Sequence, residues 1–234
     1  MLTQHYNAKT DQEDRERQVT IYLKKSQSET ELLLDLAHEL VHAGTRPSFD
    51  PYDPTLSLGK YIFAAIEGKG GEVDAVMSEC KIGLEISKIQ GVSVPRCQNY
   101  WPIPGSSSLG IINRDIVRQD FYRVGKWFAE VSTALGGEMS LFPLLSEESP
   151  KLYSSTGHAP YPFALMQKFE EITETACRNS KVRMRSLASE GPTTSFSSLF
   201  SVPSEPRPEQ RDRQKDQKNR SSVHQFLLQR CTHF

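Results

Sequence analysis

The chain of 234 residues contains little cysteine. Its four cysteines, Cys80, Cys97, Cys177 and Cys231, lie far apart and form no C-x-x-C pair. This spacing favours neither a thiolate metal site nor a disulfide framework. We therefore expect the four thiols to be reduced and to serve mainly in packing.

Net charge and long apolar runs are also lacking. The formal net charge is −1, and no apolar run approaches the length of a membrane span. The first seven residues lack the basic start and apolar stretch of a signal peptide. We therefore expect no nucleic-acid partner and no membrane partner. A cytoplasmic location is the default expectation, and secretion by a signal-less route is left open, as is the oligomeric state.

A capping box predicts a helix that begins near Glu29. Ser28 can accept a hydrogen bond from a first-turn N–H group, and Glu31 can reach back to Ser28. The residues that follow are strongly apolar, and Gly44 and Pro47 provide the stop. We expect this helix to be mostly buried, with ionisable side chains along one side. These are Glu31, Asp35, His38, Glu39 and His42.

The same helix contains an HExxH pattern. His38 and His42 are four residues apart, with Glu39 beside the first histidine. Residues at this spacing share a helix face, so both imidazoles can bind one Zn²⁺ ion while Glu39 activates a water molecule as general base. Burying so many ionisable groups without partners is unfavourable, and a bound cation removes that cost. The alternative is a pair of hydrogen-bonded histidines on the wet side of an amphipathic helix.

A third protein ligand is expected further along the chain. Metzincins require Gly and His where this chain has Thr45 and Ser48, so that subclass is excluded. Glycines at residues 68–71 open directly into a second predicted helix, and Glu72 starts an E-x-x-A segment there. Glu72 is the expected ligand, and Glu79, two turns later on the same face, is the rival. Without a metal, Glu72 would be an ordinary glutamate favoured by the helix dipole.

These segments resemble the zincin signature of HExxH zinc metallopeptidases, and the later glutamate resembles that of gluzincins. HELVHA followed by E-x-x-AV is also similar to the effector metalloproteases that bacterial pathogens inject into host cells, over about residues 19–90. The resemblance implies zinc-dependent hydrolysis of a peptide or protein substrate, with His38, His42 and Glu72 as zinc ligands and Glu39 as base. A second donor for the transition-state oxyanion is also needed. The candidates are Tyr52, Tyr61, His158 and Tyr161.

The expected fold class is α+β: a mainly helical zincin-like domain with a small sheet over residues 1–180, then a disordered tail over residues 181–234. Residues 19–24 alternate with period two and predict a strand, which zincins place along the cleft. Helical spacing predicts one long helix from Asn113 to Leu135 and another after Pro162. Residues 58–66 fit either a helix or a strand. Beyond residue 180, Ser, Pro and charged residues accumulate, which is typical of disorder.

The expected function is therefore that of a zinc metallopeptidase. One alternative is a catalytically inactive zincin-like domain that binds a metal or a protein through the same cleft. Another is a structural helical protein in which HExxH is accidental. Zinc content distinguishes the last from the other two, and cleavage that depends on Glu39 distinguishes the first two.

Overall fold

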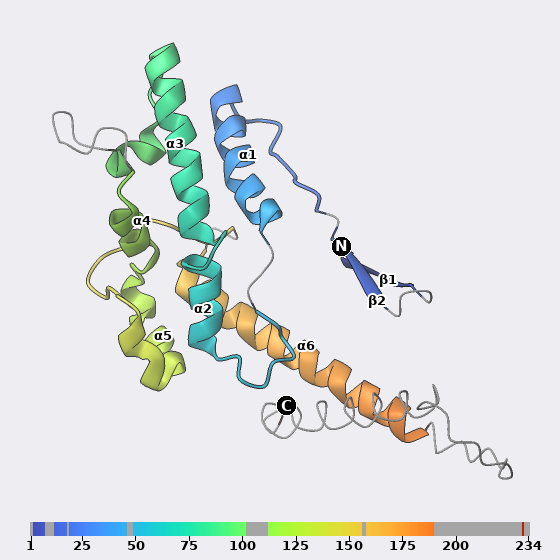
Figure 1. Ribbon diagram of the computed structural model, residues 1–234. Helices are drawn as coiled ribbons and strands as arrows, with labels where there is room; N and C mark the ends of the chain where they lie inside the picture. Colours follow the sequence, from blue (N-terminus) through green and yellow to red (C-terminus); the bar gives the residue numbers. More distant parts are fainter. Residues whose placement is uncertain are drawn as a thin grey trace, which may run out of the picture.

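The chain folds mainly into α-helices (Figure 1). The computed structural model describes residues 2–7, 12–17, 19–45, 49–101, 112–155, 158–189 and 231. The α-helices in these residues are α1 (Glu29–Gly44), α2 (Leu58–Ile66), α3 (Glu72–Gln90), α4 (Arg114–Phe121), α5 (Phe128–Leu135) and α6 (Tyr161–Ser189). Shorter 3₁₀ helices are η1 (Pro95–Tyr100), η2 (Gly125–Trp127) and η3 (Gly136–Leu141). No helix within the described ranges is both long and apolar enough to cross a membrane.

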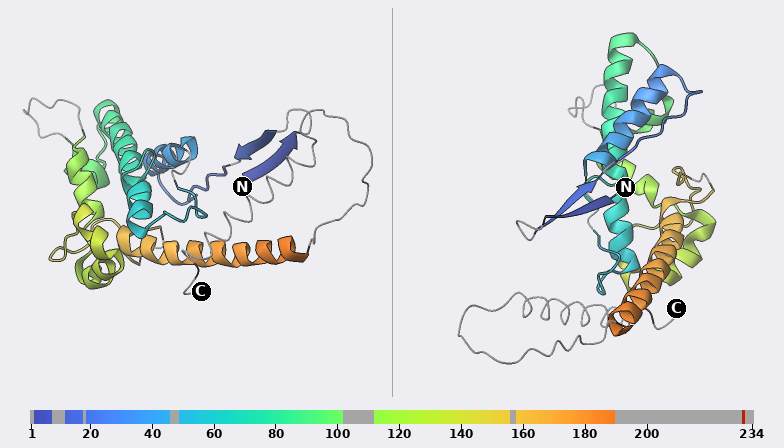
Figure 2. Two further views of the ribbon diagram at one scale, coloured as in Figure 1. Left: turned by 60° about the horizontal axis from the view of Figure 1, so that its bottom comes forward. Right: turned by 90° about the vertical axis from the view of Figure 1, so that its right-hand side faces the viewer.

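The strand predicted at residues 19–24 is wrong. These residues form no ladder, and Tyr22 is 89% exposed. Alternating side chains favour a strand only when a neighbouring strand supplies hydrogen bonds and cover, and none pairs with this segment in the described part of the chain. The described strands are instead β1 (Leu2–Asn7) and β2 (Gln12–Arg17), an antiparallel pair that lies to the side of α1 (Figure 1, Figure 2).

Helix α1 begins and ends as predicted, but it is not mostly buried. Ser28 Oγ accepts from the Glu31 N–H group, and Glu31 Oε2 accepts from the Ser28 N–H group, which completes the capping box. The helix packs mainly on α3, which runs beside it (Figure 1). Its opposite face has no cover from the described residues, and Leu33 and Leu40 are 50% and 54% exposed. The expected burial is wrong because the pairing with α3 covers only one side.

The glycine-rich segment before α3 allows the start of α3 to lie close to the C-terminal end of α1. Gly70 has a φ of +72°, which favours glycine. A Cβ atom on Gly70 would overlap the side chain of Thr45, so another residue there would force Thr45 to move. Residues 58–66, which the sequence left open as helix or strand, form helix α2, and Ser57 caps its N-terminus.

The single helix predicted from Asn113 to Leu135 is interrupted. Asn113 caps α4 as expected, with its side chain accepting from the Ile116 N–H group. After Phe121 the chain turns, and the N–H groups of Val124 and Gly125 donate to Leu145 O. The apolar spacing continues across the turn because both helices pack on the same core. That core includes Leu34, Ile62, Ile66, Val73, Cys80, Cys97, Val117, Phe121, Tyr122 and Val131.

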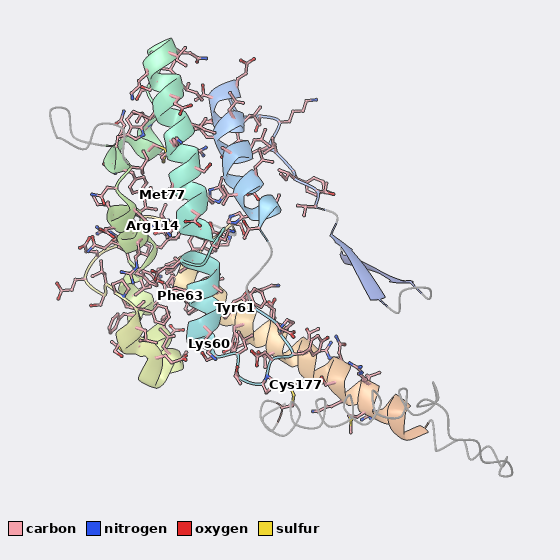
Figure 3. All side chains as sticks on the ribbon, in the orientation of Figure 1. Lys60, Tyr61, Phe63, Met77, Arg114 and Cys177 are labelled. Atoms are coloured by element: carbon pink, nitrogen blue, oxygen red, sulfur yellow. A yellow bond between two sulfur atoms is a disulfide. The ribbon has the colours of Figure 1, made fainter. Side chains whose placement is uncertain are left out.

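The cysteines are paired, so the expectation of reduced thiols is wrong. Cys80–Cys97 joins α3 to η1, and Cys177–Cys231 joins α6 to the C-terminal part of the chain (Figure 3). Sequence spacing could not reveal these pairs because packing of separate segments brings the sulfur atoms together. Helix α6 starts beside Pro162 as predicted and continues past residue 180. The predicted tail from residue 190 onward, apart from Cys231, lies outside the described residues.

Candidate metal site

The two histidines of α1 face the first turn of α3. Their Nε2 atoms are 3.2 Å apart. Glu72 Oε2 lies 3.3 Å from His38 Nε2, and Glu72 Oε1 lies 3.7 Å from His42 Nε2. The fold therefore brings together His38, His42 and Glu72, with one ligand atom from each inside a 4.8 Å group.

Hydrogen bonds at the far side of each ring fix which nitrogen faces the group. His42 Nδ1 is 2.9 Å from Gly70 O, and His38 Nδ1 is 3.1 Å from Glu79 Oε2. A carbonyl and a carboxylate only accept, so both Nδ1 atoms carry hydrogen. In the neutral rings, each Nε2 then presents a lone pair toward Glu72. Such an acceptor behind each ring is typical of metal-binding histidines.

The charges of the group explain its shifted pKa values. Burial lowers the pKa of His38, but the carboxylates of Glu72 and Glu79 outweigh burial and raise it to about 9. Interaction with Glu72 raises the pKa of His42 despite burial. Burial would raise the pKa of Glu72, but the two imidazole rings lower it to about 2. The carboxylates thus stabilise positive charge on the two rings, and the rings stabilise the negative charge of Glu72.

One oxygen of this cluster is left without a hydrogen bond. Glu72 Oε2 is buried and, when the rings are neutral, has no hydrogen-bond partner within the described residues, because His38 Nε2 at 3.3 Å then carries no hydrogen. Two Nε2 lone pairs and this carboxylate converge on one place, and a divalent cation there would satisfy all three. Two imidazoles and one carboxylate form a donor set that zinc takes in catalytic sites, with a fourth position left for water. The residues present therefore fit a zinc ion.

Glu79 occupies a different place from Glu72. It is 8% exposed, contacts Nδ1 of His38, and accepts from Arg96 Nε at 2.7 Å. Its carboxylate thus lies behind the ring, on the side opposite the Nε2 group. Of the two glutamates that the sequence left open, Glu72 is the one that faces both histidines across this group.

Asp74 and Arg114, for which the sequence predicted no role, fix the backbone at Gly70 that contacts the far side of the His42 ring. The Gly70 N–H group donates to Asp74 Oδ2 at 2.9 Å, and Arg114 on α4 binds the other oxygen of Asp74. Gly70 O is thereby held toward His42. The glycine cluster at residues 68–71 was the available signal, because close backbone approach often requires glycine.

Of the four candidates for the oxyanion donor, Tyr161 is the one whose hydroxyl lies beside the group of His38, His42 and Glu72 in the described structure. Burial raises the pKa of its hydroxyl, and the charge of Glu72 and a hydrogen bond to it raise the pKa further, with a smaller contribution from Glu39. The hydroxyl therefore stays protonated and able to donate. Its ring packs edge-on against Phe121, with 4.8 Å between centroids.

The other three candidates lie elsewhere. Tyr61, on α2, packs against Phe169 of α6 (Figure 3). Tyr52 accepts a hydrogen bond from Asn179. His158 is exposed in the loop before α6. Glu39 is also exposed, one residue after His38 on α1, and its charge acts on the Tyr161 hydroxyl.

Comparison of the chain with protein-family models, with curated proteins and with solved structures finds no match.

Proposed function

We propose that this chain is a zinc-dependent peptidase, with His38, His42 and Glu72 as zinc ligands and Glu39 as general base. The observation that carries the proposal is the convergence of two Nε2 atoms on the Glu72 carboxylate, whose buried Oε2 has no hydrogen-bond partner within the described residues. An exposed glutamate stands beside the first histidine, as peptide hydrolysis requires.

Each side chain has a distinct part in this chemistry. When bound, zinc would polarise the scissile carbonyl and make a water molecule more acidic. Glu39 would take the proton of that water on its carboxylate and deliver it to the leaving amine. Tyr161, whose hydroxyl stays protonated beside Glu72, would donate to the oxyanion of the tetrahedral transition state.

The metal assignment is tested by comparing two glutamates of α3. Wild type should copurify with one equivalent of zinc, measured by elemental analysis without chelator. Glu72→Gln should weaken zinc binding far more than Glu79→Gln, because a neutral amide is a poor zinc ligand. Glu79→Gln keeps an oxygen that can accept from His38 Nδ1, and a group in that place typically contributes about 10–100-fold in affinity.

Two results would count against the assignment. Metal-free wild-type protein would remove the zinc site and the enzyme with it. A larger loss in Glu79→Gln than in Glu72→Gln would move the third ligand to Glu79.

The role of Tyr161 gives a separate prediction. Tyr161→Phe keeps the ring against Phe121 and removes only the hydroxyl, so zinc binding and fold should be preserved. Loss of an oxyanion donor should lower kcat by about 10²-fold with little change in KM. Steady-state kinetics on a cleaved peptide measure both constants. Tyr61→Phe, on α2, is the matched control, and equal activity of Tyr161→Phe and wild type would exclude Tyr161 from the reaction.

A second candidate function is an inactive zincin-like domain that binds metal or protein. It is favoured by the irregular segment at residues 19–24, because zincins bind extended substrates along a strand in that position. A zinc-loaded wild type that cleaves no member of a diverse peptide pool would support this candidate over the enzyme.

A further inference from the structure

Arg96 connects the two helices that carry the candidate metal ligands. Its Nε donates to Glu79 Oε1 on α3 at 2.7 Å, and its Nη1 donates to Asp35 Oδ1 on α1 at 2.8 Å. The other oxygen of Asp35 accepts from Gln27 Nε2 at 2.6 Å. The planar fork of a guanidinium suits such a bridge between two carboxylates. Arg96 therefore restrains both the Glu79 carboxylate and the pairing of α1 with α3.

The Cys80–Cys97 disulfide holds the backbone on both sides of this ion pair. Cys80 directly follows Glu79, and Cys97 directly follows Arg96. Both sulfur-bearing residues are buried, at 1% and 0% exposure. Two unbonded thiols need more room than a disulfide, so loss of the bond would displace η1 and Arg96 from α3.

We propose that Arg96 is a positioning residue for the metal-binding histidine His38, and that the Cys80–Cys97 disulfide keeps Arg96 in place. Arg96 fixes Glu79, Glu79 accepts from His38 Nδ1, and the ring then presents Nε2 to Glu72. This inference rests on the proposed function, since it requires the metal to bind His38. The affinity of the site for its metal thus depends on a disulfide that touches no ligand.

The test uses the full chain, stripped of metal and titrated with Co²⁺ while its visible absorption spectrum is recorded. Arg96→Gln should weaken Co²⁺ binding measurably, but by no more than the about 10–100-fold expected for Glu79, which contacts the ligand directly. It should also alter the spectrum, because the His38 ring is no longer held in one orientation. Arg96→Lys should restore part of the affinity, since a single ammonium keeps the charge but not the fork.

The matched control is Arg118→Gln. Arg118 pairs with Glu67 at 37% and 14% side-chain exposure, close to the 40% and 10% of Arg96 and Glu79. Glu67 bonds to Arg118 and Tyr122 rather than to a candidate ligand. Arg118→Gln should therefore leave the cobalt affinity and spectrum unchanged. Circular dichroism and thermal melting of the metal-free variants show that each is folded.

A double-mutant cycle tests the role of the disulfide. Replacing Cys80 and Cys97 by serine should weaken Co²⁺ binding, and adding Arg96→Gln to that variant should cause little further loss, because both changes act on one path. Replacing Cys177 and Cys231 by serine should have no such effect. Unchanged affinity in Arg96→Gln, additive losses in the cycle, or an equal loss in Arg118→Gln would overturn the inference. No Co²⁺ binding by wild type would instead refute the proposed function.

Discussion

Glu39→Gln should keep one equivalent of zinc and the native fold, yet lose peptide hydrolysis by about two to four powers of ten. Glu39 is exposed on α1 and contributes no atom to the group of His38, His42 and Glu72, so its replacement leaves the ligands intact. An amide cannot take the proton from the attacking water, which is why the chemical step fails. The change is isosteric, so binding of substrate should be largely retained.

Activity and metal content must be measured on the same preparation of Glu39→Gln. Cleavage of a diverse peptide pool, followed by mass spectrometry, gives the rate, and elemental analysis gives the zinc. Glu85→Gln is the matched control, because Glu85 is also an exposed helical glutamate, on α3 rather than α1. Equal cleavage by wild type and Glu39→Gln would assign the activity to another base or to a contaminant.

The local part of the site could be predicted from the sequence because its signals are local. Ser28 and Glu31 fix the start of α1 through a capping box, and the four-residue spacing of His38 and His42 requires only a helix to share a face. The glycines before Glu72 predicted the end of the preceding element and the start of a new helix. These elements depend on neighbouring residues, so a single sequence is enough to find them.

The long-range part could not be predicted in this way. Arg96 reaches Asp35 across 61 residues of sequence, and Tyr161 reaches Glu72 from the start of α6. No sequence periodicity predicts these contacts, because they depend on how the helices pack against one another. The disulfides were missed for the same reason, and the strand at residues 19–24 was wrong because alternation does not supply a neighbouring strand. The capping signal at Asn113 was right, but hydrogen bonds to Leu145 O interrupt the helix that follows it.

His38→Ala and His42→Ala should each abolish zinc binding. Either change removes one of the three proposed protein ligands, and the remaining pair would provide too little binding energy to hold zinc through dialysis. Each histidine also has its own support, Glu79 behind His38 and Gly70 behind His42. Neither ring can therefore replace the other. Elemental analysis of each purified variant should find zinc close to zero.

Thermal unfolding gives an independent measure of the same loss. A ligand that binds only the folded state at about 100 times its Kd stabilises it by about 2.7 kcal/mol. For a chain of this size, that gain raises Tm by about 5–10 °C. After bound metal has been removed with a chelator, added zinc should produce this shift in wild type and in His158→Ala, whose histidine is exposed outside the group, but not in His38→Ala or His42→Ala. A wild-type shift that persists in both site variants would place the bound zinc elsewhere on the chain, and the peptidase mechanism would have no metal centre.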